Sequence, residues 1–444
     1  MSFSLVKKSL SSPEPRLDED LGLRRMRGFK RLIGVSEALE RLRKAVAHRI
    51  REVEEVELID SLGRICAEDV KAMMDVPPYD RSAVDGYAII AEDAFGASPM
   101  NPVKLKLVGR ILAGSNPLAI PKIERGEAAE IMTGAPMPSN ANAVVMAEDV
   151  KVVEDGIEVL KPVHPYRNVS RRGEDFAKGE IVIRRGVRVK PWHIGALASL
   201  NVKRLKVFRR PRISVLSTGD ELVELGGELE PGKIVNSTKP MLMALLLAEG
   251  CIPLDLGIVG DDVDEIHSRI LTGLRKSDGV IVTGGSSIGV RDLVPEAVKR
   301  LGEIIFHGLR IRPGKPTGAA VSDGKPIFML SGFPVAAAVG FEALVRPILA
   351  HIQGCVVEPR PRVEGILTRR VVNPPNTRSY VRVRVFKSDG RVMVEPLRLT
   401  GSGILSSLTR GNGLLIIPEE REGYDEGDSV IVELLQPIEK GDER

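Results

Sequence analysis

The chain has 444 residues, with 64 Lys and Arg against 60 Asp and Glu, and a formal net charge of +4. This length predicts about three domains, and the balanced charge argues against a protein that binds nucleic acid over its whole surface. The three cysteines are far apart and form no CxxC pair, and the six histidines form no HxH or HExxH cluster. A disulfide framework and a Cys/His zinc site are therefore excluded, and any metal would have oxygen ligands, for which magnesium is the natural candidate.

The apolar segments are too short to predict a membrane protein. None approaches the roughly 20 residues that span a bilayer, because the run 327–339 is interrupted by Ser331, Gly332 and Pro334. The N-terminus has no apolar segment followed by a cleavage site, so we expect a cytoplasmic protein with no membrane or nucleic-acid partner. Abundant Lys, Arg and Glu with only two Gln resemble the composition of thermophile proteins.

The first half of the chain predicts a β-rich domain inserted into another domain. Residues 1–30 lack apolar periodicity and predict a disordered extension, and a helix is predicted over 35–48 with Ser36 as its N-cap. Residues 76–165 form a β-rich domain with short strands at 103–108, 128–133, 143–148 and 156–161. Residues 31–75 and 166–208 flank it as one discontinuous domain, with a strand at 181–183 and a helix that begins at Pro191.

The second half predicts an α/β domain followed by a β domain. In residues 209–356, strands at 212–217, 253–259, 280–283, 304–311 and 327–330 alternate with helices at 238–249, 263–275, 293–301 and 335–349. Such alternation predicts a parallel, doubly wound sheet that binds ligands at the carboxyl ends of its strands. Residues 357–438 predict a β-barrel-like domain, in which the alternation over 380–386 indicates a strand with one exposed face.

Two loops of the α/β domain suit an anion. The segment Asp278–Asp292 runs from an apolar strand into Gly, Ser and Thr residues and then a helix; such a glycine-rich loop lets the backbone approach an anion at the helix N-terminus. Arg312 and Lys315 lie in a loop stiffened by prolines, which suits a phosphate or tetrahedral oxyanion. A plain strand-to-helix loop and a basic surface loop are the ordinary alternatives.

Four other polar segments have weaker signals. Ser217-Thr-Gly-Asp-Glu leaves a buried strand at the edge where such sheets bind ligands, which favours a function. The Asp, Ser and Asp at positions 80, 82 and 85 also fit a turn with Asx bonding. Thr133 and Gly134 fit either a hairpin or a stiff ligand loop, and Arg171-Arg-Gly-Glu-Asp fits solvated ion pairs or the edge of an anion and metal site.

Taken together, six motifs in order resemble the molybdopterin molybdenumtransferases, the MoeA and gephyrin E-domain family, over nearly all of residues 30–438. They are Pro78-Tyr-Asp-Arg-Ser-Ala-Val-Asp-Gly-Tyr-Ala, Thr133-Gly-Ala-Pro-Met-Pro, Arg172-Gly-Glu-Asp, Ser217-Thr-Gly-Asp-Glu-Leu, Thr283-Gly-Gly-Ser-Ser-Ile-Gly-Val-Arg-Asp and Arg312-Pro-Gly-Lys-Pro. The resemblance implies an elongated homodimer with four domains per chain. It also implies a reaction in which molybdate, with magnesium or another divalent metal, is inserted into adenylylated molybdopterin and AMP is released.

The resemblance also implies roles for individual residues. Its active site would lie between the α/β domain and the second domain of the partner chain. The catalytic carboxylates would be Asp85, Asp175, Glu221 and Asp292, and the metal ligands Asp220, Glu221 and Asp292. Molybdate, phosphate or the rest of the substrate would be bound by Thr133, Ser286, Ser287, Arg312, Lys315, Pro316, Ser407 and either Arg378 or Arg382. Asp85, Thr133 and Asp175 would come from the partner chain.

The chain departs from the family pattern in two places. Arg312 stands where a lysine is usual, and Leu330-Ser-Gly-Phe-Pro-Val-Ala replaces Leu-Pro-Gly-Asn/Tyr-Pro-Val-Ser. The second change motivates an alternative, a paralogue or scaffold that binds molybdopterin without turnover, although the retained carboxylates argue against it. A third hypothesis is another enzyme on the same fold, such as a molybdopterin adenylyltransferase or nucleotide hydrolase, which the four-domain length disfavours. The sequence does not distinguish molybdate from tungstate as the substrate. A molybdopterin adenylyltransferase and the recipient molybdoenzymes are candidate partners.

Overall fold

The computed structural model describes residues 32–284, 293–397 and 401–441. The chain divides into two compact units, one formed by residues 1–48, 211–349 and 357–444 and the other by residues 49–210 and 350–356. The predicted loop residues Ser286, Ser287 and Asp292 lie outside the described residues, as does the whole of the predicted N-terminal extension, residues 1–30.

A six-stranded sheet in the order β16-β13-β17-β21-β20-β18 is the centre of the first unit. Its strands are β13 Arg212–Thr218, β16 Ile252–Val259, β17 Gly279–Thr283, β18 Glu303–His307, β20 Gly318–Ser322 and β21 Lys325–Leu330. The first four in spatial order are parallel, whereas β20 pairs antiparallel with both neighbours. The predicted α/β domain is confirmed, but a wholly parallel sheet is wrong. Asp323 and Gly324, both with positive φ, form a two-residue turn between β20 and β21, and such a turn joins antiparallel strands.

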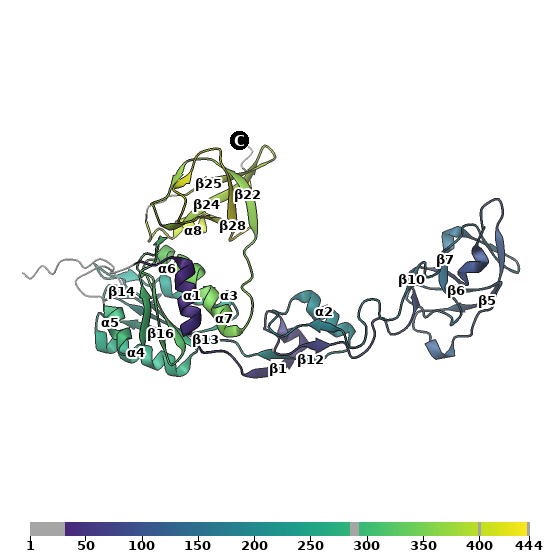
Figure 1. Cartoon of the computed structure of the whole chain (residues 1–444), viewed down its shortest axis with the longest axis horizontal. Helices are drawn as coiled ribbons and strands as arrows, with labels where there is room; N and C mark the ends of the chain where they lie inside the picture. Colours follow the sequence, from purple (N-terminus) through teal and green to yellow (C-terminus); the bar gives the residue numbers. More distant parts are fainter. Residues whose placement is uncertain (1–31, 285–292, 398–400, 442–444) are drawn as a thin grey trace, which may run out of the picture. The chain divides into compact units, whose positions relative to one another are not determined.

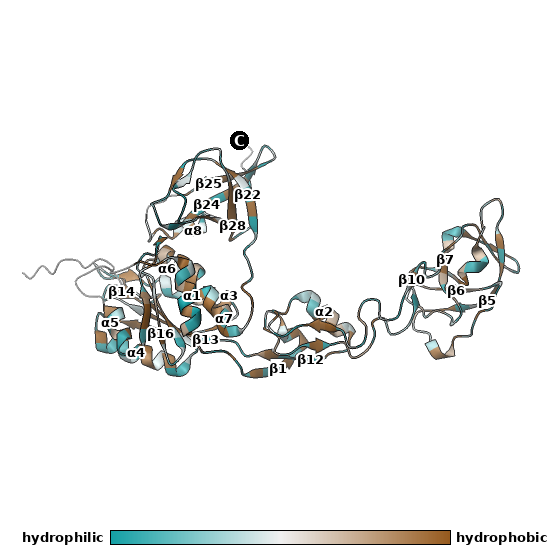
Figure 2. Ribbon diagram, viewed as in Figure 1, coloured by the Kyte–Doolittle hydropathy of each residue, from teal (hydrophilic) through white to brown (hydrophobic). Residues whose placement is uncertain are grey.

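Helices cover both faces of this sheet (Figure 1). Helices α4 Val263–Lys276 and α5 Leu293–Lys299 lie on one face, and α1 Val35–Ala45, α3 Thr238–Ala248 and α6 Pro334–Gly340 lie on the other. Ile266, Ile270, Val280 and Val282 are fully buried in the core beneath α4 and α5. Both helices show teal and brown residues in Figure 2, as expected of helices with one apolar face. Helix α1 begins at Val35 after Gly34, without a side-chain cap, so the predicted N-cap at Ser36 is wrong.

One helical stretch is longer and more apolar than the sequence led us to expect. Helix α6 continues through a π-helical segment, Phe341–Val345, into α7 Arg346–Gln353. The 20 residues from 334 to 353 are long and apolar enough to cross a membrane by length and composition, but 72% of an 18-residue window within them is buried inside the protein. This stretch therefore packs as a core helix.

The C-terminal part of the first unit is a β-barrel. Its strand path β24-β25-β22-β28-β26 returns to β24, so the sheet closes, as predicted for a barrel-like domain. The elements are β19 Ile311–Arg312, β22 Arg362–Leu367, β23 Val371–Val372, β24 Arg378–Ser388, β25 Arg391–Pro396, α8 Ser406–Thr409, β26 Gly413–Ile417, β27 Gly423–Tyr424, β28 Ser429–Leu434 and β29 Glu439–Lys440. The predicted strand 304–311 instead ends at His307, and β19 pairs with β24 of the barrel.

The second unit is β-rich. A six-stranded sheet in the order β7-β4-β6-β5-β9-β8 is built from β4 Gly86–Ile89, β5 Val103–Ile111, β6 Glu127–Ile131, β7 Ala143–Met146, β8 Val150–Val153 and β9 Gly156–Val159. Around a separate apolar core lie the pairs β1 Val53–Glu57 with β12 Arg204–Phe208 and β2 Val70–Lys71 with β11 Ile181–Ile183, together with α2 Pro191–Ser199. The short pair β3 Arg81–Ser82 and β10 Val169–Ser170 belongs to the same unit.

Candidate functional site

The carboxyl ends of β13 and β17 are bonded together by polar side chains. The hydroxyl oxygens of Ser217 and Thr283 are 2.9 Å apart in the buried interior, and Thr218 Oγ1 donates to the backbone oxygen of Thr283 at 3.3 Å. Gly284 follows with φ +90°, and a Cβ added there would lie 2.1 Å from the backbone oxygen of Thr218. Only glycine fits at this position, because Gly284 lies in close contact with the neighbouring strand.

Three carboxylates gather where β13 and β16 end. Asp220 and Glu221 are exposed, and Asp220 Oδ1 accepts a hydrogen bond from the backbone N–H of Asp261 at 3.0 Å. Burial, followed by the negative charges of Asp220 and Glu221, raises the pKa of Asp261. Asp261 was not predicted as a site residue, although Gly260-Asp261-Asp262 follows a predicted strand at the same edge of the sheet. In the described part of the chain no group of three Asp, Glu, His or Cys side chains is arranged to hold a metal.

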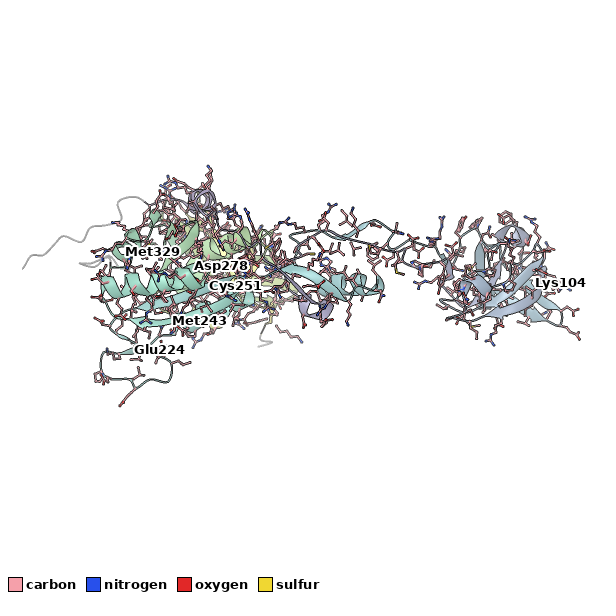
Figure 3. All side chains as sticks on the ribbon, turned by 90° about the horizontal axis from the view of Figure 1, so that it is seen from below. Lys104, Glu224, Met243, Cys251, Asp278 and Met329 are labelled. Carbon is pink, nitrogen blue, oxygen red and sulfur yellow. The ribbon has the colours of Figure 1, made fainter. Side chains whose placement is uncertain are left out.

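Two lysines contact residues that follow β13, Lys233 at Asp220 and Lys239 at Glu224. Lys233 Nζ donates to the backbone oxygen of Asp220 at 2.6 Å. The buried Lys239 pairs with Glu224 at 2.6 Å and with Asp255 at 2.9 Å, and Glu224 lies where a loop extends from the α/β domain (Figure 3). This loop connects β14 Leu222–Val223 to β15 Ile234–Val235, and the ion pair of Glu224 with Lys239 attaches its first residue to α3.

Basic side chains gather where the α/β domain meets the barrel. Arg312 and Lys315 are exposed, the latter in a turn closed by the bond from Thr317 N–H to the Gly314 oxygen, with Pro316 inside it. Arg382 is only 3% exposed, and it donates from Nε to Ser407 Oγ at 3.2 Å and from Nη1 to the Tyr380 oxygen at 3.1 Å. Burial, and then the positive charge of Arg312, lowers the pKa of Arg382.

The structure of the barrel contradicts the predicted exposure of the strand 380–386 and brings Arg382 into contact with Ser407. The face of the strand 380–386 that carries the arginines was predicted to be exposed, but Arg382 is buried, with Ser407 of the α8 turn against it. Arg382 and Ser407, both predicted site residues, are therefore in contact. Arg378 is instead held by Glu419, with both Nε and Nη2 3.0 Å from the same carboxylate oxygen.

The second unit contains a separate set of predicted residues. Asp85 Oδ1 accepts hydrogen bonds from the backbone N–H and the hydroxyl of Thr133, both at 2.7 Å. These two bonds lower the pKa of Asp85, so the exposed carboxylate is held in its charged form. Asp175 lies in a segment whose backbone is bonded to Val76, next to Arg172, which pairs with Asp75 at 2.6 Å.

Comparison with known proteins shows which family has this combination of domains and motifs. The MoeA N-terminal region (domain I and II) matches residues 33–201, a probable molybdopterin binding domain matches 214–351, and the MoeA C-terminal region (domain IV) matches 364–435. The chain belongs to the MoeA family. The predicted resemblance, fold class and place among the transferases of molybdenum cofactor biosynthesis are thereby confirmed.

Individual MoeA relatives match along most of the chain. A molybdopterin biosynthesis protein of Methanocaldococcus jannaschii is 42% identical over 394 residues, which cover 87% of this chain and 93% of that protein. The molybdopterin molybdenumtransferase of Bacillus subtilis is 36% identical over 395 residues, 87% of this chain and 90% of the relative. The crystal structure of a MoeA protein from Pyrococcus horikoshii has a TM-score of 0.79 and 33% identity, and the match covers 91% of this chain and all of that one.

In this MoeA chain, buried Tyr380 gives a testable pH effect. Burial raises its pKa from 10.0 to about 12, so above pH 10 the unfolded chain loses a proton that the folded protein keeps. Stability is fully present below pH 10 and falls by about 1.4 kcal/mol per pH unit between pH 10 and about 12. We expect Tyr380→Phe to remove this part of the loss. Chemical denaturation at pH 9 and at pH 11 would measure the difference in free energy of unfolding between wild type and variant. We expect this difference to be smaller at pH 11 than at pH 9. An equal difference at the two pH values would contradict the raised pKa of Tyr380.

Proposed function

We propose that this chain inserts molybdenum into adenylylated molybdopterin and releases AMP. The observation that carries the proposal is the division of charge along one edge of the α/β domain. Carboxylates gather at the ends of β13 and β16, and Arg312 and Lys315 lie beyond β21, where the barrel adds Arg382. A substrate with a phosphoanhydride at one end and an oxyanion acceptor at the other needs both kinds of group.

The basic side chains suit the incoming oxyanion. Arg312 and Lys315 are exposed cations on a loop stiffened by prolines, and Arg382 adds a positive charge fixed by Ser407. Molybdate and tungstate are tetrahedral dianions, which such fixed donors attract. In the reaction water hydrolyses the phosphoanhydride bond and AMP leaves. The two dithiolene thiols displace two oxygen ligands of the oxyanion, which leave as two waters that carry the two thiol protons and two protons from solvent.

The acidic corner suits a divalent cation shared with the substrate. Magnesium usually takes one or two carboxylates and completes its shell with waters and substrate phosphates. Asp220 and Glu221, exposed beside Asp261, fit that pattern without a complete protein cage. Magnesium bound there would neutralise charge on the phosphoanhydride. We assign Asp292 to the same site from its place in the motif alone.

The remaining assignments extend this proposal to the assembly. We infer a homodimer with four domains per chain, 31–75 with 166–208, 76–165, 209–356 and 357–438. Asp85, Thr133 and Asp175 of one copy then serve the substrate held by the α/β domain of the other. The contact that holds Asp85 charged supports its role, because a carboxylate fixed by Thr133 can orient a cation or a water without further rearrangement. We propose a cytoplasmic location and recipient molybdoenzymes as downstream partners.

The test is AMP release from adenylylated molybdopterin and magnesium, with molybdate and tungstate supplied separately. Release that depends on either oxyanion would support the transferase and show its metal preference. Release without any oxyanion would indicate a nucleotide hydrolase. Tight substrate binding without release under either oxyanion would favour the non-catalytic paralogue, to which the replaced loop residues Ser331 and Ala336 point.

A further inference from the structure

Phe333 is an exposed aromatic residue at the ligand-binding edge of the sheet. It lies three residues after the end of β21 and immediately before α6, and 60% of its surface is exposed. Single exposed apolar residues are common and carry no meaning alone. The setting of Phe333 differs because the backbone on both sides of it is held in place.

Four hydrogen bonds fix this backbone. The Phe333 N–H donates to Ser331 Oγ at 3.2 Å, and the Phe333 oxygen accepts from Ala337 N–H at 2.9 Å. Before it, the Gly332 oxygen accepts from Thr238 Oγ1 at 2.7 Å. After it, the Val335 N–H donates to the Ser402 oxygen of the barrel at 3.0 Å. Ser331, which replaces a proline of the family pattern, thus helps to fix the backbone that carries the aromatic ring of Phe333.

The neighbours of Phe333 place it between the two ends of the proposed site. One edge of the ring meets Gly403, where an added Cβ would lie 3.1 Å from Cδ1 of Phe333. Gly403 shortly precedes Ser407, the partner of Arg382. On the other side, a Cβ on Gly332 would lie 3.4 Å from Cα of Gly284. The ring therefore lies beside Gly403, four residues before Ser407, and the backbone that precedes it lies beside Gly284 at the end of β17.

We propose that Phe333 is a positioning residue that stacks on the pterin ring of the substrate. This inference rests on the proposed function. The acidic corner at β13 lies two strands from β21, about 10 Å away, so the phosphoanhydride and adenylyl groups belong at that end. The dithiolene must meet the oxyanion at the basic cluster. Because the pterin is fused to the dithiolene-bearing ring, the planar group next to Phe333 is the pterin and not the adenine.

The first experiment compares Phe333→Leu with Phe333→Tyr in the full-length protein. Affinities for adenylylated molybdopterin and for AMP are measured separately. We expect Leu to weaken binding of adenylylated molybdopterin about 10- to 100-fold, the range that stacking of a heterocycle contributes. Tyr should bind within about threefold of wild type, and AMP affinity should not change in either variant. In turnover, KM should rise for Leu, with kcat changed less.

Direct contact is tested by fluorescence. Trp192 is the only tryptophan of the chain, so Phe333→Trp in a Trp192→Phe background gives a single reporter. We expect the substrate to quench this reporter strongly and AMP to leave it unchanged.

Each outcome is decisive. Equal substrate affinity of Leu and wild type, or an unquenched reporter, would overturn the stacking role while leaving the proposed function intact. A parallel loss of AMP affinity would assign the ring to adenine and overturn the pterin assignment. A wild-type protein that binds no adenylylated molybdopterin would overturn the proposed function and this inference with it.

Discussion

Replacing Gly284 with Ala is expected to lower the free energy of unfolding by roughly 3–5 kcal/mol and to abolish AMP release. The added Cβ would lie 2.1 Å from the backbone oxygen of Thr218 and 2.9 Å from its Oγ1, at a φ of +90°. Neither contact can relax at a flexible side-chain end, so β13 and β17 must separate at the edge that binds the substrate. Denaturation midpoints and single-turnover AMP release would measure both effects.

Gly232 provides a matched control in the same unit. Its φ is +88°, almost the same as that of Gly284, but an added Cβ would meet nothing within 4 Å. Gly232→Ala should therefore carry only the backbone strain, about 1–2 kcal/mol. Equal destabilisation by the two substitutions would show that the contact between Gly284 and Thr218 is not the cause.

Co-expression of Asp85→Asn with Arg312→Ala is expected to restore activity that neither variant has alone. Each substitution removes one charged group of the proposed site, and we expect each variant alone to be slowed about 100-fold. In a shared-site homodimer, random pairing makes about half of the dimers mixed, and each of these has one complete site. About a quarter of the wild-type activity should return. Differently tagged chains allow the mixed dimers to be isolated before AMP release is measured.

Replacing Asp85 with Asn removes the negative charge and changes little else. Its side-chain oxygen can still accept the Thr133 bonds that Asp85 accepts at 2.7 Å, so the loop should keep its conformation. Mixing Asp85→Asn with Thr133→Ala, which alters the same unit, should restore nothing and serves as the control. Mixed dimers of the first pair that stay inactive would contradict a site shared between two copies.

Periodicity predicted most elements of the α/β domain within one or two residues. The strand 212–217 is observed as β13 Arg212–Thr218 and the helix 263–275 as α4 Val263–Lys276, because buried strands and amphipathic helices carry clear apolar patterns. The strand β20, which lies between β21 and β18, was missed, although Asp323-Gly324 is a strong hairpin signal. The strand predicted at 304–311 crosses Gly308, where the backbone leaves one sheet and enters another.

The candidate site was predicted less completely. Motif order identified Asp85 with Thr133 and Arg382 with Ser407 among the nominated residues, and the structure shows each pair in hydrogen-bond contact. Asp261 and Phe333 were not nominated. Each lies two or three residues after a strand ends at the same sheet edge, and this position is the signal that could have identified them.

The sequence by itself determined the family, the fold class and the kinds of residue in the site, because these depend on local patterns and on the order of motifs. Only the tertiary structure decided which side chains meet and which are buried. Arg382 alternates with valines like a surface residue, yet it is 3% exposed, because the valines of β24 fill the barrel core and the turn of α8, whose Ser407 contacts Arg382, lies against the outer face. Asp220 and Asp261 are 41 residues apart, and parallel pairing of β13 with β16 brings them together, a contact between distant segments that no local pattern encodes.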